Sequence, residues 1–267
     1  MEKPRRVDGD TYIVTTNFPA GQLGILPINW YLIEAREPVL IDTGMPIERE
    51  QFLTTLGSLI DPAEIKWIFL THDDNDHAGN LAQAMKAAPN ARVLMPFLGF
   101  ARLADSHVLP MDRVLLINPG QSFSAGDREL MVLRPPVWDS PATQALYDPK
   151  NRTLFSSDSL GAFIPGPAEV VTDIPEAAFT EGFQTFARAL SPWIHLVDQS
   201  KFDRHLETIS RLEPRTILSS HGLVAHGCAD SLLKALSAAP AMEPFVGPDH
   251  EEMLAMMAEP EPAGVPS

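Results

Sequence analysis

Cysteine is almost absent from this chain, because Cys228 is the single cysteine among 267 residues. The sequence therefore cannot form an internal disulfide, and it offers at most one thiolate to a metal ion. A reducing compartment fits this composition. Long apolar runs are missing as well, and residues 1–6 (Met-Glu-Lys-Pro-Arg-Arg) lack the apolar stretch of a signal peptide. We therefore expect a soluble, cytoplasmic protein.

Positive charge is also scarce. The chain has 20 Lys and Arg residues against 35 Asp and Glu residues, which gives a formal net charge of −15. Nucleic-acid phosphates and anionic membrane surfaces repel such a chain, so we expect neither as a partner. Part of the negative charge is instead available to neutralise bound cations.

Apolar residues are plentiful, at 45% of the sequence, and a chain of this length can bury a substantial core. We predict one large domain over residues 1–239. Residues 240–267 are rich in proline, acidic and small residues, which predicts a tail that is poorly ordered or weakly docked.

Short apolar runs alternate with longer amphipathic ones along the chain, which is typical of an α/β fold. The patterns predict strands over residues 11–15, 30–33, 39–41, 66–70, 92–95, 114–117, 130–133, 143–147, 153–155 and 216–219. They predict helices over residues 47–60, 81–88, 175–196, 202–212 and around 232–236. The number of strands indicates two sheets.

The densest group of polar residues follows the apolar run at 67–70. Residues 72–77 (His-Asp-Asp-Asn-Asp-His) hold two histidines and three aspartates. A solvated acidic loop does not need histidines at both ends, whereas a metal site does, and buried carboxylates at this density need a cation or extensive pairing. We therefore predict a metal site in this loop between a strand and a helix.

Three further motifs follow apolar strands. They are Leu-Ile-Asp-Thr-Gly at 40–44, Leu-Phe-Ser-Ser-Asp at 154–158 and Ser-Ser-His-Gly at 219–222. Judged alone, Asp158 could cap a turn and His221 could be an ordinary turn histidine. Together with the 71–79 cluster, the motifs occur in an order and at spacings that resemble the metallo-β-lactamase superfamily, over roughly residues 10–225. The resemblance implies a four-layer αββα sandwich for the 1–239 domain, whose loops hold one or two metal ions at one edge of the sheets.

Two departures from the usual superfamily pattern sharpen the resemblance. The common cluster is HxHxDH, but Asp74 makes it HxDxDH here. The flavodiiron branch also carries a carboxylate there, usually glutamate, and the segment 27–33 is similar to the strand before its first motif. Counting back from Asp158 places Asp139 where most relatives have a third histidine. The alternative for Asp139 is an ordinary turn formed with Ser140 and Pro141.

The resemblance assigns metal ligands residue by residue. It implies that His72, Asp74 and Asp139 hold one metal, that Asp76, His77 and His221 hold the other, and that Asp158 bridges them. It also implies that Asp42 supports the site through hydrogen bonds without touching metal, although a turn could equally select Asp-Thr-Gly. Three neutral imidazoles and four carboxylates carry about four negative charges, which offset two divalent ions. Such a set suits iron or manganese better than zinc, because anionic donors reduce Lewis acidity.

The leading hypothesis is a dinuclear non-haem protein, a diiron oxidoreductase, that binds dioxygen or a related diatomic and reduces or activates it. The stretch after His221 is too short for a flavin-binding flavodoxin domain, so electrons would come from a separate donor or from a small-molecule substrate. The alternatives are a dinuclear hydrolase of an ester, thioester, lactone or phosphodiester, and a sensor of oxygen or metal without turnover.

Other histidines and aromatic residues receive no catalytic role from the sequence. The histidines outside the motifs are expected to be ordinary surface or core residues; they are His107, His195, His205, His226 and His250. Trp30, Trp138 and Phe163 either line the pocket or belong to the core, which is the commoner place for aromatic residues in such runs.

Overall fold

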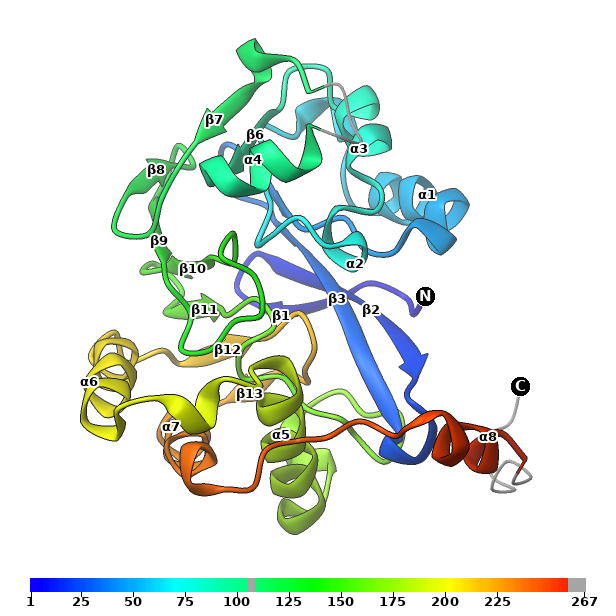
Figure 1. The fold of residues 1–267 in the computed structure, drawn as a ribbon. Helices are drawn as coiled ribbons and strands as arrows, with labels where there is room; N and C mark the ends of the chain where they lie inside the picture. Colours follow the sequence, from blue (N-terminus) through cyan, green and yellow to red (C-terminus); the bar gives the residue numbers. More distant parts are fainter. Residues whose placement is uncertain (105–108, 259–267) are drawn as a thin grey trace.

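Two facing β-sheets form the centre of the molecule, and helices cover both outer surfaces (Figure 1). This computed structural model describes residues 1–104 and 109–258. His107 lies outside the described residues.

The first sheet has seven strands in chain order, of which β1 to β4 are antiparallel and β4 to β7 are parallel. Its strands are β1 (Arg5–Asp8), β2 (Thr11–Pro19), β3 (Ile25–Ile33), β4 (Val39–Ile41), β5 (Trp67–Phe69), β6 (Arg92–Met95) and β7 (Val114–Leu116). Because β4 and β5 are parallel, the loops that follow them leave the same edge of the sheet.

The second sheet has six strands in the order β13-β12-β11-β10-β9-β8, in which β11 and β12 are parallel and the other neighbours antiparallel. Its strands are β8 (Ser122–Ser124), β9 (Glu129–Leu133), β10 (Ala145–Asp148), β11 (Thr153–Phe155), β12 (Thr216–Leu218) and β13 (Ala225–His226). The loops after β11 and β12 therefore also leave one edge together.

The described helices are α1 (Arg49–Leu59), α2 (Asn75–Ala78), α3 (Leu81–Ala87), α4 (Phe97–Leu103), α5 (Glu176–Leu190), α6 (Gln199–Ser210), α7 (Ala229–Ser237) and α8 (His250–Ala258). Short 3-10 turns lie at Gly21–Leu23, Pro46–Glu48, Pro62–Glu64, Met111–Arg113, Val171–Asp173, Ile194–Leu196 and Ala239–Ala241. No helix among the described residues is long and apolar enough to span a bilayer.

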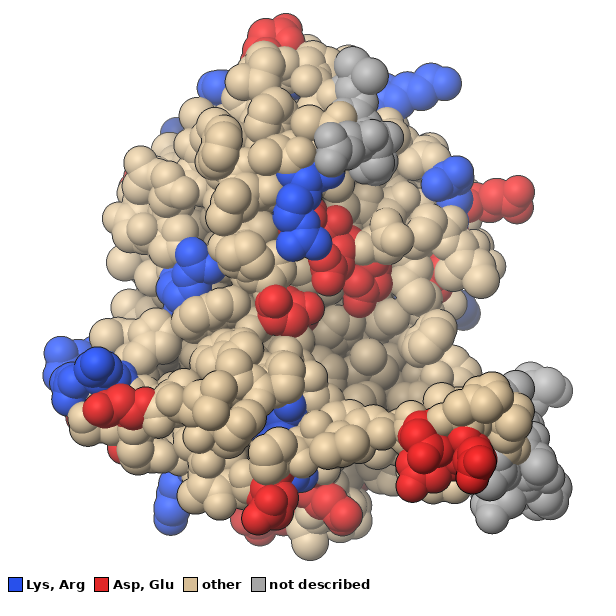
Figure 2. Space-filling model, viewed as in Figure 1, with Lys and Arg blue, Asp and Glu red and all other residues tan. Residues whose placement is uncertain are grey.

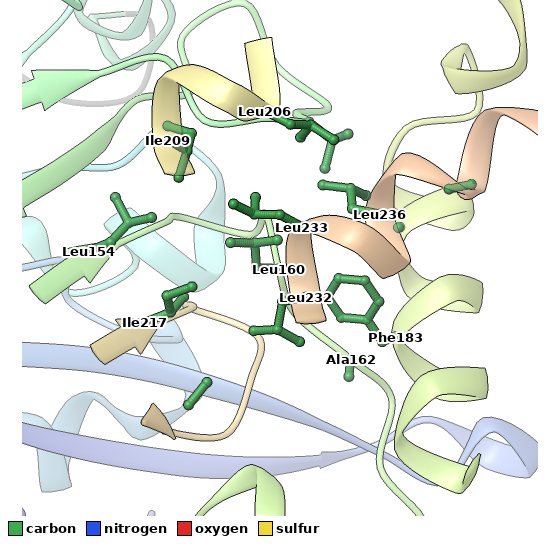
Figure 3. Close-up of a cluster of buried hydrophobic side chains, with 14 of the residues drawn as sticks. Leu154, Leu160, Ala162, Phe183, Leu206, Ile209, Ile217, Leu232, Leu233 and Leu236 are labelled. Atoms are coloured by element: carbon green, nitrogen blue, oxygen red, sulfur yellow. The ribbon is translucent and has the colours of Figure 1, made fainter. Parts of the chain in front are cut away.

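Three buried hydrophobic clusters separate the four layers. One joins the first sheet to α1 and α3 and includes Phe52 and Leu81. The second fills the space between the sheets, and the third joins the second sheet to α5, α6 and α7 around Phe183 (Figure 3). Neighbouring residues within a strand alternate between clusters, as Leu154 belongs to the outer cluster and Phe155 to the inner one. This arrangement confirms the predicted αββα sandwich.

All ten predicted strands overlap observed strands, but β1, β8 and β13 were not predicted. The single helix predicted over 175–196 is wrong, because α5 ends at Leu190 and a separate 3-10 turn covers Ile194–Leu196. Pro192 explains the break, since a proline disfavours helical backbone at the residue before it, here Ser191. Helix α4 was also missed, although it carries Arg102, which contacts two loops of the site.

The proposed tail contains the end of a 3-10 turn and helix α8, joined by residues 242–249 without regular structure. Val246 is 85% exposed and Leu254 is 53% exposed, so these two apolar side chains are not packed into the core. The division into a domain over residues 1–239 and a tail stays a prediction.

Candidate metal centre

The predicted site residues lie at the ends of neighbouring strands. Asp42 directly follows β4, whereas His72, Asp158 and His221 are each the third residue after β5, β11 and β12. Parallel pairing aligns β4 with β5 and β11 with β12, so the chain delivers these residues to one edge of the two sheets. The sequence pattern of an apolar run followed by a polar motif therefore fixes the place of the site.

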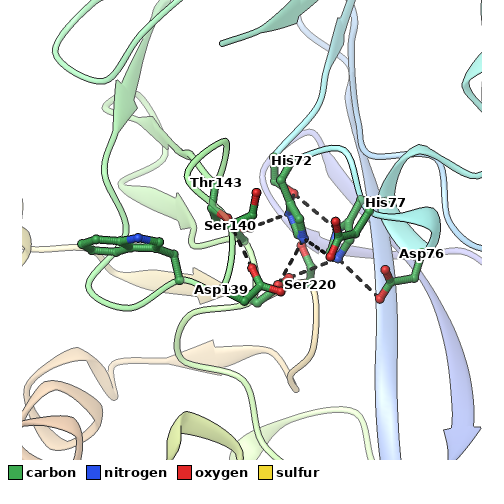
Figure 4. Close-up of polar contacts among 12 residues, drawn as sticks. His72, Asp76, His77, Asp139, Ser140, Thr143 and Ser220 are labelled. Carbon is green, nitrogen blue, oxygen red and sulfur yellow. Dashed lines mark hydrogen bonds and ion pairs between the residues drawn. The ribbon is translucent and has the colours of Figure 1, made fainter. Parts of the chain in front are cut away.

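The structure brings all seven predicted ligands together. They form three overlapping groups whose ligand atoms lie within 4.8 Å of one another; the groups are His72, His77 and Asp158; Asp76, His77 and His221; and His72, Asp74 and Asp139. Two of these groups are the sets that the resemblance assigns to the two metals. Figure 4 shows His72, His77 and Asp76 converging from one side of the site and Asp139 approaching from the other. Ligation itself stays a prediction.

Asp158 occupies the middle of the site. Its Oδ2 lies 3.3 Å from His72 Nε2, and its Oδ1 lies 3.1 Å from His77 Nε2 and 3.4 Å from His221 Nε2. Asp76 Oδ2 approaches the same side, at 3.5 Å from His77 Nε2 and 3.2 Å from His221 Nε2. A single carboxylate thus faces the imidazoles of both proposed sets.

The tautomers of His72 and His77 follow from the hydrogen bonds around Asp42. This carboxylate is fully buried and accepts from the backbone N–H and the hydroxyl of Thr71, both at 2.8 Å, and from the hydroxyl of Ser220 at 3.2 Å. His77 Nδ1 donates to it at 2.9 Å. Because the Thr71 hydroxyl gives its proton to Asp42, it accepts from His72 Nδ1 at 3.1 Å. Both rings therefore turn an unprotonated Nε2 toward the site when neutral.

His221 is held in the same way by a different partner. Its Nδ1 lies 3.0 Å from the backbone carbonyl of Pro27. A carbonyl oxygen can only accept, so Nδ1 carries the proton and Nε2 presents its lone pair to Asp76 and Asp158. All three imidazoles are thus oriented for binding a cation through Nε2.

The electrostatics of the site call for positive charge. Burial lowers the pKa of His77, but the carboxylates of Asp158, Asp76 and Asp42 outweigh it and hold that pKa well above its ordinary value. Burial raises the pKa of Asp158, yet the three imidazoles hold it well below its usual range. The pKa of Asp139 is raised, first by burial and then by Asp158. Burial likewise lowers the pKa of His221, but Asp158 and Asp76 outweigh it and raise that pKa, so without a cation His77 and His221 favour their protonated forms.

Two buried atoms test whether metal ions fit here. His77 Nε2 and Asp158 Oδ1 are buried and have no hydrogen-bond partner. Buried polar atoms without partners are rare in native proteins, and these two face each other among nitrogen and oxygen donors of the kinds that bind transition metals. The residues therefore fit a pair of metal ions.

Comparison with known proteins agrees with this geometry. A family model described as "ODP family beta lactamase" matches residues 26–222. The chain belongs to this family. One relative of this ODP-family chain is the nitric oxide reductase of Moorella thermoacetica, which is 27% identical over 198 residues, 73% of this chain and 49% of that protein. Another is the anaerobic nitric oxide reductase flavorubredoxin of Pectobacterium atrosepticum, 25% identical over 198 residues, 73% of this chain and 38% of that protein.

Solved structures show the same fold. The flavodiiron protein of Giardia intestinalis has a TM-score of 0.78 at 19% identity and covers 90% of this chain and 60% of its own. The rubredoxin oxygen:oxidoreductase of Desulfovibrio gigas has a TM-score of 0.75 at 19% identity and covers 91% of this chain and 63% of its own. These matches show the shared fold, and together with the family model and the curated relatives they confirm the resemblance to the metallo-β-lactamase superfamily and its flavodiiron branch. The chain spans about half the length or less of the two relatives described above.

The three aromatic residues considered as pocket walls in this ODP-family chain have different places. Trp30 is 1% exposed and stacks edge-on against Phe52, so it belongs to the core. Phe163 packs against Phe186, whose ring centroid lies 5.6 Å from that of His221, so this pair borders the site. Trp138 precedes Asp139, and its carbonyl accepts hydrogen bonds from Ser191 and Trp193.

The other described histidines lie outside the three ligand groups. His205 Nε2 lies 3.1 Å from the carbonyl of Pro135, His226 Nδ1 lies 3.0 Å from the hydroxyl of Thr216, and His195 is exposed. Sequence reasoning missed Thr71 and Ser220, which hold Asp42, although both adjoin predicted ligands. It also missed Arg102, which no local sequence pattern marks.

Proposed function

We propose that this chain is a dinuclear non-haem iron protein that binds a diatomic molecule, dioxygen or nitric oxide, and reduces or activates it. The observation that carries the proposal is the convergence of four carboxylates on three buried imidazoles, around the buried atoms His77 Nε2 and Asp158 Oδ1, which lack hydrogen bonds. The names of the relatives, nitric oxide reductase and rubredoxin oxygen:oxidoreductase, support it. The cytoplasm, a reducing compartment, remains the proposed location.

In this proposal His72, Asp74 and Asp139 would hold one iron, and Asp76, His77 and His221 would hold the other. Asp158 faces the imidazoles of both sets. When bound, the iron pair supplies electrons and open coordination positions for the diatomic molecule. The chain contributes four carboxylates, which offset the charge of two divalent ions and stabilise higher oxidation states. Phe186 packs against His221 and limits the access of water from that side.

The source of electrons is a further part of the proposal. The family relationship covers residues 26–222, and the names of the relatives mention rubredoxin and flavorubredoxin. We expect a separate redox protein, or an oxidisable small molecule, to deliver electrons to the centre. The same carboxylates disfavour the hydrolase alternative, since they weaken the Lewis acidity on which water activation depends.

The test is metal analysis of protein made in iron-supplemented cells, together with absorption spectra recorded anaerobically and after addition of dioxygen or nitric oxide. We expect two irons per chain, one for each assigned set, and a spectral change that depends on the gas. His221→Ala should lose the change, whereas the matched variant His226→Ala should retain it. Full occupancy by zinc with turnover of an ester or lactone would replace the proposal by the hydrolase alternative, and manganese would revise the metal.

Asp139 supplies a narrower prediction. Its carboxylate belongs to the group with His72 and Asp74, and the hydroxyl of Thr143 lies 3.4 Å from its Oδ1. If it is a ligand, Asp139→Ala should weaken one metal by at least about tenfold and leave the other bound. Titration of the metal-free protein with Fe²⁺ under anaerobic conditions measures this. Unchanged stoichiometry and spectrum would assign Asp139 to an ordinary turn instead, and Thr143→Ala serves as a control for loss of loop order.

A further inference from the structure

Arg102 on helix α4 reaches across the mouth of the candidate site. Its Nε lies 2.6 Å from Asp73 Oδ2, its Nη2 lies 3.5 Å from Asp74 Oδ1, and its Nη1 donates to the hydroxyl of Ser140 at 3.1 Å. Asp73 and Asp74 belong to the loop after β5, whereas Ser140 adjoins Asp139 in the loop before β10. One guanidinium therefore joins the two loops that carry a proposed ligand set.

The carboxylates at this place are crowded. The side chain of Asp73 is only 5% exposed, although the geometry gives it no place in a ligand group. Within residues 1–104 and 109–254, every ion pair between Lys or Arg and Asp73, Asp74, Asp76, Asp139 or Asp158 is made by Arg102. Figure 2 shows acidic side chains gathered in the hollow of this face, directly below basic ones. Arg102 is thus the counter-charge to a buried carboxylate beside the site.

The two oxygens of Asp74 face different partners. Oδ1 is directed to Arg102, and Oδ2 lies 3.8 Å from His72 Nε2, on the side of the proposed metal. The side chain of Asp74 is 37% exposed, so without Arg102 it is free to turn into solvent, away from the neighbouring carboxylates. Because Arg102 holds Oδ1 on the outer side, Oδ2 stays directed toward the proposed metal as a single donor.

Ser140 links Arg102 to the turn that holds Asp139. Its hydroxyl oxygen accepts from Arg102 and also from the backbone N–H of Ala142 at 3.2 Å, and its carbonyl accepts from Thr143 N–H at 3.1 Å. These bonds close the turn that presents Asp139 to His72 and Asp74. A planar guanidinium can serve both loops at once because its donors point in fixed directions.

We propose that Arg102 is a positioning residue for one of the two metals, namely that of the set His72, Asp74 and Asp139. The inference rests on the proposed function only in that metal ions bind at the site. Arg102 repels the metal ion weakly, since its guanidinium is half exposed and solvent screens the charge. The orientation that Arg102 gives to Asp74 and to the turn at Asp139 therefore outweighs this repulsion. Arg102 thus strengthens metal binding.

The test is anaerobic titration of the metal-free full chain with Fe²⁺, comparing the wild type with Arg102→Gln. We expect one dissociation constant to rise by about ten- to hundredfold and the other to stay unchanged, as is typical when an outer partner of a metal ligand is lost. Arg102→Lys keeps the charge but not the planar fork, so the same metal should weaken by a smaller factor. Arg211→Gln makes the same change of charge at an exposed pair with Glu207 and should alter neither constant.

The inference would be overturned if Arg102→Gln bound both metals as tightly as the wild type does. Equal weakening of both metals in this variant, or tighter binding than in the wild type, would also overturn it. Wild-type binding by Arg102→Lys would also overturn it, because charge alone would then suffice. Ser140→Ala removes one contact while keeping the Asp73 ion pair, so it should weaken the same metal even if Arg102→Gln folds poorly. A wild type that binds no Fe²⁺ would instead refute the proposed function.

Discussion

Asp158→Asn is expected to release both metal ions. The side chain lies within 3.4 Å of the Nε2 atoms of His72, His77 and His221, which belong to both proposed ligand sets. An amide of the same size removes the negative charge and turns an N–H group toward imidazole lone pairs, so neither position keeps its shared donor. We expect each dissociation constant for Fe²⁺ to rise by at least about a hundredfold, measured as metal retained after anaerobic reconstitution and gel filtration.

Asp74→Asn is the informative comparison. Asp74 belongs to one ligand group, so this variant should keep one metal while Asp158→Asn keeps neither. Circular dichroism of both metal-free variants checks that the sheets have formed. If Asp158→Asn retained two metals, the central carboxylate would not be a shared ligand.

The position of the site was predictable because strands and ligands are linked in the sequence. His72, Asp158 and His221 each follow an apolar strand by three residues, and parallel pairing brings such strand ends to one edge. The apolar runs themselves are strong signals, since their residues alternate between two buried layers. The order of strands and motifs along the chain therefore sufficed to predict both the sandwich fold and the convergence of the motifs at one edge.

Other features are absent from any local pattern. Strand β13 has two residues, and only Phe123 of the three residues of β8 is buried, so neither forms the apolar run that revealed the equally short β4 and β11. Arg102 lies 28 residues from Asp74 along the chain, on a short helix whose periodicity gives no hint of the partner. Its contact exists only because α4 packs beside the loop after β5. Tertiary packing, not propensity, decides such contacts.

The break of the predicted 175–196 helix at Leu190 has a structural use. Ser191 leaves the helix, and its hydroxyl donates to the carbonyl of Trp138, to which Trp193 Nε1 also donates. Trp138 directly precedes Asp139. Because the helix ends at Leu190, Ser191 and Trp193 anchor the loop of a proposed ligand. Pro192 was the sequence signal for this helix end.

Asp42→Asn is expected to destabilise the fold and to release the metal bound by His77. Asp42 is fully buried, and four donors from Thr71, His77 and Ser220 converge on its carboxylate. Asparagine tolerates the left-handed backbone of this position, where φ is 58°, so the backbone adds little strain. Its amide N–H₂, however, would face donors, and His77 would have to give up its Nδ1 proton and protonate Nε2. A ring protonated at Nε2 cannot ligate through that atom.

The expected loss in free energy of unfolding is about 3–5 kcal/mol for the metal-free protein, as found when one partner of a buried charged network is removed. Urea denaturation measures it, and ¹⁵N chemical shifts of the His77 ring report the tautomer. Asp198→Asn is the matched control, because Asp198 caps α6 at the surface and asparagine caps helices equally well. A stable Asp42→Asn variant with both metals bound would show that Thr71 and Ser220 alone orient His77, and that the buried carboxylate is dispensable.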